Sequence, residues 1–434
     1  MIGKKSPSPA LLRAVKIRRD ILKVICMSYT GINLESVKAN NRSSILKLLN
    51  EQGPTSRKDL AQALGLTPAS VTQNCSDLID AGILCEAGEV KNSNRAGRRK
   101  ILVGINYSCR YVLSISIELE NTCLTLSDLR GENHTSCQIK TEPQLPPYEF
   151  LTKVALEGLS LIYQAGLSHE MILGVGVSIP GLVDREKGVS RSAYRIWENP
   201  VDVRGLLGRY LHFPILLDNN VNAFAKAELL FGGSREKENI LFMKWGPGVG
   251  SSIVVHNKLY ESRFSKEGEL GHITVNKDGK LCRCGRRGCL ETLANIHAMA
   301  NRMSEACTAE TAPALHDLVG GDVTLIRGRN IDWWFHAQDE GFWRILDPVV
   351  DQVARSLANT VTILAPDAVV FYGPVFHLPG IKERFLRHCA EVDPNYNSDY
   401  ITMSTLSDKI DFIGPLAVVV NELFLSPFGI LGQG

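Results

Sequence analysis

Four potential metal ligands lie within eighteen positions of the sequence: His272, Cys282, Cys284 and Cys289. Three thiolates and one imidazole form a Cys3His set of the kind that binds zinc. Both sulfurs of a Cys-x-Cys pair reach one ion only in a tight turn, and Gly285 and Gly288 can supply the positive φ angles that such a turn needs. Three unrelated buried cysteines are the alternative. The clustering favours zinc as a cofactor.

Two carboxylates, Glu269 and Glu291, flank this set. If the four ligands fill a tetrahedral zinc shell, both carboxylates are left for another partner. An imidazole has two nitrogens, so His272 can bind zinc through one and hydrogen-bond a ligand hydroxyl through the other. A polyol suits this combination of groups.

The segments Glu-Leu-Gly-His at 269–272 and Cys-Arg-Cys-Gly-Arg-Arg-Gly-Cys-Leu-Glu at 282–291 resemble the signature of the ROK family, named for repressors, open reading frames and kinases. Weaker matches extend from residue 40 to the C-terminus. The resemblance implies an α/β body at 105–434 with the two-lobed actin-like ATPase (sugar kinase) fold and a zinc loop at 267–291.

The length and the charge distribution bound the remaining possibilities. A chain of 434 residues exceeds one ordinary hydrophobic core, so two or three domains are expected. Residues 1–100 hold 17 Lys and Arg against 8 Asp and Glu, whereas the remainder holds 31 against 38. A basic head on an acidic body suggests that the head binds a polyanion. A solvated basic surface is the alternative.

Cysteine usage and hydropathy indicate a cytoplasmic protein. The chain has eleven cysteines, and the eight outside the cluster are too dispersed for a disulfide framework, which favours a reducing compartment. The apolar stretch at 21–29 is too short to span a bilayer and precedes no cleavage site, so we expect no membrane association and no signal peptide.

The N-terminal hundred residues predict a DNA-binding head. Residues 1–39 form a basic extension, either an amphipathic helix or a loosely ordered arm. A helix at 43–50 is followed by one that Ser56 caps, with Asp59 able to reach back. A short turn then leads to a helix capped by Thr67. Helix, three-residue turn, helix is the helix-turn-helix plan, and we place an α+β winged helix-turn-helix domain at 40–104.

In this plan the second helix enters the major groove and a basic hairpin grips phosphates or the minor groove. The block resembles the winged helix-turn-helix of ROK transcriptional regulators, although a helix pair used for protein contacts is the alternative. The candidate residues on the second helix and the hairpin are Ser70, Thr72, Gln73, Asn74, Arg95, Arg98 and Arg99.

The nucleotide loops of the resembled kinases are altered here. Where those kinases carry Asp-x-Gly-Gly-Thr, this chain has Ser116, Glu118, Leu119 and Glu120. Both glycines and the metal-directing aspartate are missing, and two glutamates would repel a triphosphate. Pro247 interrupts the second glycine loop, which a tight turn between strands explains equally well, and Pro374 replaces the second of two paired glycines.

The sugar side of the resembled site is nearly intact. Family kinases have Glu-Asn-Asp where this chain has Asp218, Asn219 and Asn220, and their aspartate is the general base. An amide cannot take a proton near neutral pH, but Asn220 can still hydrogen-bond two hydroxyls. Alternatively, the asparagines only cap the next helix.

These observations predict a sugar-responsive DNA-binding repressor of carbohydrate metabolism genes, without kinase activity. It would be a homodimer, or a tetramer, that binds double-stranded operator DNA and a sugar or sugar phosphate. A sugar kinase with Asp218 as an unusual base is the main alternative, and a regulator whose cleft senses a partner protein or nothing is another. The predicted sugar-binding residues are Asn219, Asn220, Glu269, His272 and Glu291.

Overall fold

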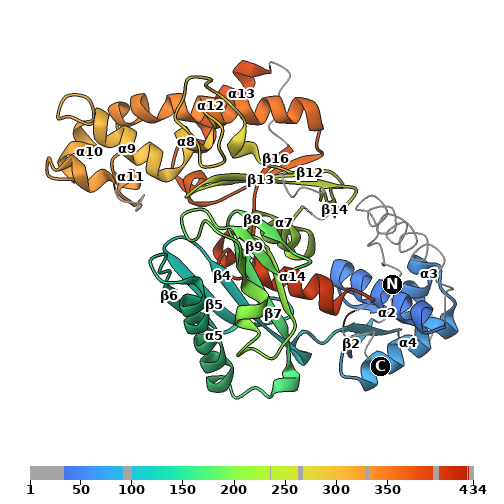
Figure 1. Ribbon diagram of the computed structural model, residues 1–434. Helices are drawn as coiled ribbons and strands as arrows, with labels where there is room; N and C mark the ends of the chain where they lie inside the picture. The colour runs from blue at the N-terminus through green and yellow to red at the C-terminus, as the bar shows by residue number, and fades with distance from the viewer. Residues whose placement is uncertain are drawn as a thin grey trace, which may run out of the picture.

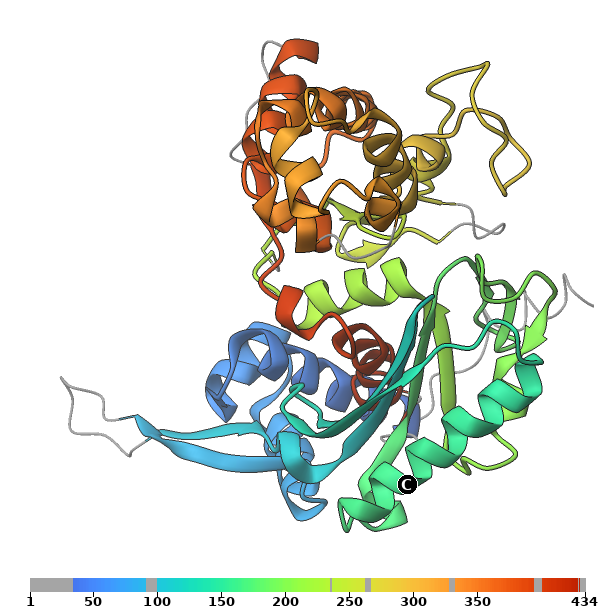
Figure 2. The same ribbon diagram turned by 90° about the vertical axis from the view of Figure 1, so that its left-hand side faces the viewer.

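The computed structural model describes residues 34–90, 100–234, 236–261, 267–327, 332–393, 400–427 and 429. The chain forms a small N-terminal domain and a body of two lobes (Figure 1). Figure 2 shows one lobe above the other, with the N-terminal domain beside the lower lobe, here called lobe 1. No helix in these described ranges is both long and apolar enough to cross a bilayer.

Within residues 34–90 and 100–105, the N-terminal domain has three helices and a three-stranded antiparallel sheet. The elements are α2 (Leu34–Gln52), β1 (Thr55–Ser56), α3 (Arg57–Leu64), α4 (Pro68–Asp80), β2 (Leu84–Val90) and β3 (Lys100–Ile105), and the strand order is β1-β3-β2. The predicted caps are confirmed: the Ser56 side chain accepts from the amide of Asp59, and Thr67 accepts from the amide of Ser70. Gly65 ends α3 in the left-handed conformation. Helix, turn and helix follow from these local signals.

The first helix, α2, begins at Leu34, nine residues before its predicted start. Lys38 and Arg42 each lie 2.6 Å from the same oxygen of Asp77 on α4. These pairings anchor the first half of α2 to a residue far along the chain. A local pattern cannot reveal such an anchor, which is why the predicted start was late.

Each lobe is built on a five-stranded sheet, and the two sheets have the same strand order when one of the two is read in reverse. In lobe 1 the order is β11-β7-β4-β5-β6, and in lobe 2 it is β14-β13-β12-β15-β16. In each sheet the first three strands along the chain pair antiparallel, and two later strands extend the sheet in parallel. In lobe 1, β7 pairs with β4 and β11 pairs with β7; in lobe 2, β15 pairs with β12 and β16 pairs with β15. Every residue of the parallel strand β7 (Ile172–Ile179) is buried, as expected when helices cover both faces of a sheet. The other strands are β4 (Tyr111–Ile117), β5 (Asn121–Asp128), β6 (Asn133–Lys140), β11 (Ile215–Asn219), β12 (Ile240–Trp245), β13 (Val249–Val255), β14 (Lys258–Leu259), β15 (Ala368–Tyr372) and β16 (Ile401–Met403).

Helices cover the two sheets and connect the lobes. In lobe 1, α5 (Pro147–Gln164) packs on one face of the sheet, while α7 (Asn220–Phe231) and α14 (Ile413–Val419) pack on the other. Gly176 lets α14 approach β7, because a Cβ there would lie 2.0 Å from a backbone oxygen of α14. The remaining elements are α6 (Val203–Leu207), α8 (Glu291–Ala294), α9 (Ile296–Ala306), α10 (Pro313–Leu318), α11 (Asp332–His336), α12 (Glu340–Leu364), α13 (Ile381–Val392), β8 (Leu182–Asp184), β9 (Val189–Ser192) and β10 (Val201–Asp202).

The N-terminal domain is packed against lobe 1 and is not tethered by a linker alone. Apolar residues of α2, including Leu46 and Leu49, share one buried cluster with the C-terminal π-helical turn Val420–Phe424. The Ser43 hydroxyl donates to the Leu425 carbonyl oxygen at 2.5 Å. The Asn50 amide donates to the carbonyl oxygen of Leu230 on α7 at 3.2 Å. The domain and α7 can therefore influence each other directly.

Candidate functional site

The predicted zinc ligands converge in the loop that follows β14. Their ligand atoms all lie within 4.8 Å of one another. The Nδ1 atom of His272 is 3.5 Å from the Cys282 sulfur, and the Cys284 and Cys289 sulfurs are 3.5 Å apart. Three thiols and an imidazole at this separation fit the tetrahedral donor set of a structural zinc ion.

Two glycines shape this loop as the sequence suggested. Gly285 has φ +87° and Gly288 has φ +65°, both in the left-handed region. A Cβ on Gly288 would lie 1.5 Å from the Asn276 carbonyl oxygen, so no other residue fits there. The amide of Cys282 donates to the Arg286 carbonyl oxygen at 2.7 Å, which closes the turn around the Cys-x-Cys pair.

The imidazole of His272 has one nitrogen on the sulfur side and the other available to a ligand. Because Nδ1 lies near the Cys282 sulfur, Nε2 is the nitrogen that can meet a ligand hydroxyl. The ring stands edge-to-face to Tyr194, with centroids 5.9 Å apart. Burial, followed by the nearby Arg286 cation, lowers the pKa of His272. Both effects favour the neutral imidazole that metal binding requires.

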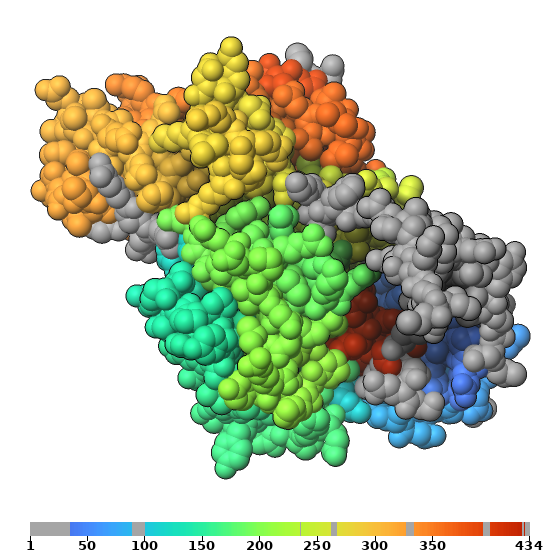
Figure 3. Space-filling view, in the orientation of Figure 1, coloured from blue at the N-terminus to red at the C-terminus, as the bar shows by residue number. Residues whose placement is uncertain are grey.

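A cavity of about 450 Å³ lies between the two lobes and takes its walls from both. In Figure 3 the segment 267–291 (yellow) belongs to the upper lobe and lies directly above the green segment of lobe 1. The structure brings all five predicted sugar-binding residues to its lining: Asn219, Asn220, Glu269, His272 and Glu291. A volume of this size is ordinary for a small-molecule site.

The two carboxylates of the zinc loop differ in their surroundings. One oxygen of Glu291 accepts from the backbone amide of Val249 at 2.7 Å. A Cβ on Gly248 would lie 3.0 Å from the other oxygen, so this glycine makes room for the carboxyl group. Burial raises the pKa of Glu291 to about 7, against the lowering effects of the Val249 amide and Lys244. Glu269 lies 3.8 Å from the Arg286 guanidinium.

The asparagines at the start of α7 combine capping with recognition. The side-chain oxygen of Asn219 accepts from the first amides of α7, and its amide nitrogen donates to the Gly181 carbonyl oxygen at 2.7 Å. The capping role weighed from the sequence is therefore real for Asn219, which has one N–H left for a ligand. Asn220 donates to Glu118 at 2.7 Å. Asn222 accepts from the Ser252 hydroxyl of lobe 2 at 2.6 Å.

Asp218, the alternative catalytic base, is held in an ion-pair network. Its side chain is 1% exposed, and one oxygen lies 2.9 Å from Lys226 and 3.5 Å from Arg185. The other oxygen accepts from the backbone amide of Asn219 at 2.8 Å. Both oxygens of Asp218 are therefore already in contact with protein cations or a backbone amide, so the group is poorly placed to contact a substrate hydroxyl.

One pairing across the cavity was not foreseen. The Nζ atom of Lys244, at the end of β12 in lobe 2, lies 3.1 Å from Oε1 of Glu118 in lobe 1. The same oxygen accepts from Asn220. Sequence reasoning identified Glu118 as an obstacle to a triphosphate but missed its partner. The two residues lie 126 positions apart, so no local pattern could have linked them.

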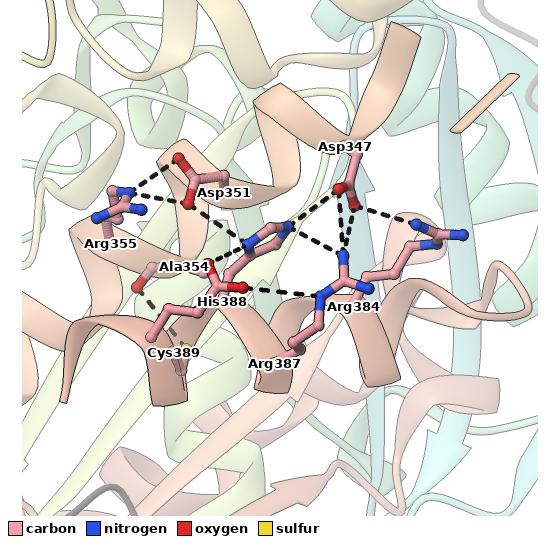
Figure 4. Close-up of polar contacts among 9 residues, drawn as sticks. Asp347, Asp351, Ala354, Arg355, Arg384, Arg387, His388 and Cys389 are labelled. Carbon is pink, nitrogen blue, oxygen red and sulfur yellow. Dashed lines mark hydrogen bonds and ion pairs between the residues drawn. The ribbon is translucent and has the colours of Figure 1, made fainter. Parts of the chain in front are cut away.

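A second group of possible metal ligands comprises Asp351, His388 and Glu391. His388 lies 3.0 Å from Glu391 and 3.2 Å from Asp347 through its two ring nitrogens. Figure 4 shows arginines around the same carboxylates, and Arg355 lies 2.8 Å from both oxygens of Asp351. With their negative charge already paired, these residues form a network that joins α12 to α13.

Four of the candidate DNA-reading residues lie on α4, and they differ in how far they are exposed. Thr72 and Gln73 are exposed, and Gln73 donates to Asp77 at 2.8 Å, which orients its amide. Hydrogen bonds from Lys38, Gln73 and Arg42 lower the pKa of Asp77 to about 2. Ser70 is half-buried at the start of the helix.

Asn74 departs from the prediction. It is 4% exposed, and its amide donates to the Ser70 carbonyl oxygen at 2.8 Å. Positions 71, 74, 75 and 78 form the buried stripe of α4, so helical periodicity turns Asn74 to the core. We remove it from the proposed DNA-reading set. The hairpin arginines, Arg95, Arg98 and Arg99, lie outside the described residues.

The fold and the cavity define a protein with the architecture of a sugar kinase joined to a DNA-binding domain. Residues 40–84 match the winged helix-turn-helix DNA-binding family, and residues 112–421 match the ROK family. The chain belongs to the ROK family.

Relatives with known names include repressors. The xylose repressor of Caldicellulosiruptor bescii is 25% identical over 412 residues, which cover 90% of this chain and 98% of that protein. The DNA-binding transcriptional repressor Mlc of Escherichia coli is 26% identical over 357 residues, which cover 79% of this chain and 83% of Mlc.

Solved structures confirm the actin-like ATPase fold. A ROK family transcriptional regulator described as a homologue of E. coli Mlc superposes with a TM-score of 0.72 at 22% identity, covering 88% of this chain and 96% of that one. A ROK family glucokinase from Streptomyces griseus, in complex with glucose and AMPPNP, gives 0.60 at 23% identity, covering 70% and 98%.

Proposed function

We propose that this protein is a sugar-responsive, DNA-binding transcriptional repressor of carbohydrate metabolism genes. Its sugar site is the cavity between the lobes, and its DNA-binding part is the winged helix-turn-helix head. The named repressors among its relatives support this class of function. We further propose that it acts as a homodimer, or as a tetramer made of two such dimers, which presents paired heads to double-stranded operator DNA.

Zinc held by His272, Cys282, Cys284 and Cys289 would serve the sugar site indirectly. The separation of the four ligand atoms supports this assignment. A bound zinc ion supplies a fixed crosslink and a fixed tautomer for His272. The Nε2–H of His272 then donates to a sugar hydroxyl, while the carboxylates of Glu269 and Glu291 accept from neighbouring hydroxyls.

The same cleft is unsuited to phosphoryl transfer. Asn220 stands where the resembled kinases have their base, and an amide cannot take a proton near neutral pH. Asp218 is buried and paired with Lys226 and Arg185. The turn between β12 and β13 contains Pro247, which has no amide proton for a phosphate. These features support binding without catalysis.

The observation that carries the proposal is the course of α7, which joins the cavity to the DNA-binding head. Its N-terminus holds Asn219 and Asn220 in the cavity lining. Its C-terminal turn offers the Leu230 carbonyl oxygen to Asn50 of α2. Figure 2 shows α7 between the lobes with the head at one end. A shift of α7 on sugar binding would therefore reach the head without an intermediary.

Coupling between the sites follows from linkage. If the sugar stabilises one position of α7 and operator DNA stabilises another, each ligand changes the affinity for the other by the same factor. A repressor of this kind would release its operator when sugar binds. On the DNA side, Ser70, Thr72 and Gln73 would contact bases or phosphates, and Arg95, Arg98 and Arg99 would contact phosphates or the minor groove.

Thermal unfolding of the zinc-loaded protein against sugars and ATP with magnesium tests this function. A ligand that binds the native state raises the melting temperature. We expect a rise with one sugar and none with ATP and magnesium. A rise with ATP, together with phosphorylation of that sugar, would contradict the proposal and favour a kinase.

A further inference from the structure

The ion pair between Glu118 and Lys244 crosses the sugar cavity from one lobe to the other. The Lys244 side chain is 12% exposed and the Glu118 side chain 34% exposed, so the pair is partly shielded from water. Oε1 of Glu118 accepts hydrogen bonds from both the Lys244 ammonium and the Asn220 amide. The only ammonium at this end of the described cavity lining is thus already in contact with a carboxylate.

A second carboxylate, Asp411, lies near this pair. Burial and the Glu118 charge raise the pKa of Asp411, against the lowering effect of Lys244. Asp411 therefore lies close enough to sense both residues. Arg185, the lining cation of β8–β9, is shared by Asp218 and Glu261. This end of the cavity offers no surplus positive charge among the residues that the structure describes.

We propose that the Glu118–Lys244 pair makes the cleft selective for an uncharged sugar over its phosphorylated form. The inference rests on the proposed sugar-sensing function and narrows it to one ligand class. If the residues of the zinc loop bind the hydroxyls on one side of a sugar, the opposite side of the sugar ring faces Asn220. A phosphoryl group there would face the Glu118 carboxylate, and any contact that it made with Lys244 would hold its negative charge beside that carboxylate.

Two further arginines line the cavity where it opens. Arg195 and Arg283 also line an adjoining open cavity, and so they lie at the mouth shared by the two spaces. A neutral hydroxymethyl group, in contrast to a phosphate, can accept from Asn220 or Lys244 and donate to Glu118 without losing the ion pair. Like charges brought together inside a partly buried site weaken binding strongly.

Isothermal titration of the full-length, zinc-loaded protein tests this selectivity. The probes are D-glucose with D-glucose 6-phosphate, and N-acetyl-D-glucosamine with its 6-phosphate. For the pair whose sugar binds, we expect the phosphate to bind at least about 100-fold more weakly. The Glu118→Gln variant should narrow this gap, the ratio of the two dissociation constants, by about tenfold or more. The substitution removes a carboxylate and frees Lys244 to contact the phosphate.

Two further variants sharpen the result. Glu170→Gln makes the same charge change at an exposed position of lobe 1, outside the linings of both cavities, and should leave the ratio of affinities unchanged. Lys244→Met leaves Glu118 without its cation and should widen the gap. Equal or tighter binding of a 6-phosphate by the native protein would overturn the inference but leave sugar sensing intact. Failure of every probe and of D-xylose to bind would overturn both the selectivity and the sugar-sensing function.

Discussion

The zinc loop gives the most quantitative prediction. A zinc ion that joins His272 to Cys289 closes a loop of 18 residues. By the chain-entropy relation used for disulfides, a crosslink around a loop of this length is worth about 3 kcal/mol. Loss of the ion through Cys284→Ser should therefore make local opening of this loop about 100-fold more frequent, since 1.4 kcal/mol corresponds to a factor of ten.

Hydrogen–deuterium exchange measures this opening directly, because amide protection reports the free energy of local unfolding. We expect peptides from 270–291 to exchange about 100-fold faster in Cys284→Ser than in the native protein. Peptides from β4 to β7 should not change. Cys85→Ser removes an exposed cysteine of the head and serves as the matched control.

Elemental analysis completes the test. The native protein and Cys85→Ser should each contain one zinc ion per chain, and Cys284→Ser should contain less. Native protein that is pure, folded and free of zinc would refute the reasoning. So would a Cys284→Ser variant that keeps its zinc and its native exchange rates.

Three substitutions test other parts of the account. Asn50→Leu removes the hydrogen bond to α7, which is worth about 0.5–1.5 kcal/mol. It should reduce the effect of sugar on DNA affinity about 2- to 10-fold while the affinity for sugar is unchanged. An undiminished effect of sugar would rule out coupling through this hydrogen bond. Gln73→Ala should weaken specific DNA binding by about 1–3 kcal/mol in an anisotropy titration. The control variant Gln62→Ala, at an exposed position of α3, should bind DNA as the native protein does. Equal losses of affinity in the two variants would argue against base reading by α4. Asp218→Asn leaves buried Lys226 without its partner and should lower the free energy of unfolding, measured in urea, by about 3–5 kcal/mol. An unchanged free energy of unfolding would mean that the ion pair does not stabilise the fold.

Local signals made much of the fold predictable. The caps Ser56 and Thr67 fixed the helix-turn-helix because a side-chain oxygen at a helix start has a defined amide partner. Strands such as β7 were predictable because burial on both faces demands a continuous apolar run. The Cys3His cluster was predictable because its four residues lie close together in sequence and the turn requires glycine.

Contacts between distant segments were not predictable. Lys244 and Glu118, or Asn50 and Leu230, meet only after two lobes and a head have assembled. The burial of Asn74 depends on which face of α4 meets the core, and an asparagine at that position gave no apolar signal. The sequence therefore identified the residues of the candidate site better than the connections between them.

The central claim is that sugar binding between the lobes changes the affinity of the head for DNA. The most direct test begins with DNA selected from a random pool by the purified, zinc-loaded protein. Its affinity is then measured by fluorescence anisotropy at fixed salt, with D-xylose, D-glucose, N-acetyl-D-glucosamine, or ATP and magnesium. We predict that one sugar weakens DNA binding at least about fivefold, the lower range of typical coupling, and that ATP has no effect. DNA affinity that no sugar alters, in a protein that binds one of these sugars, would contradict the account.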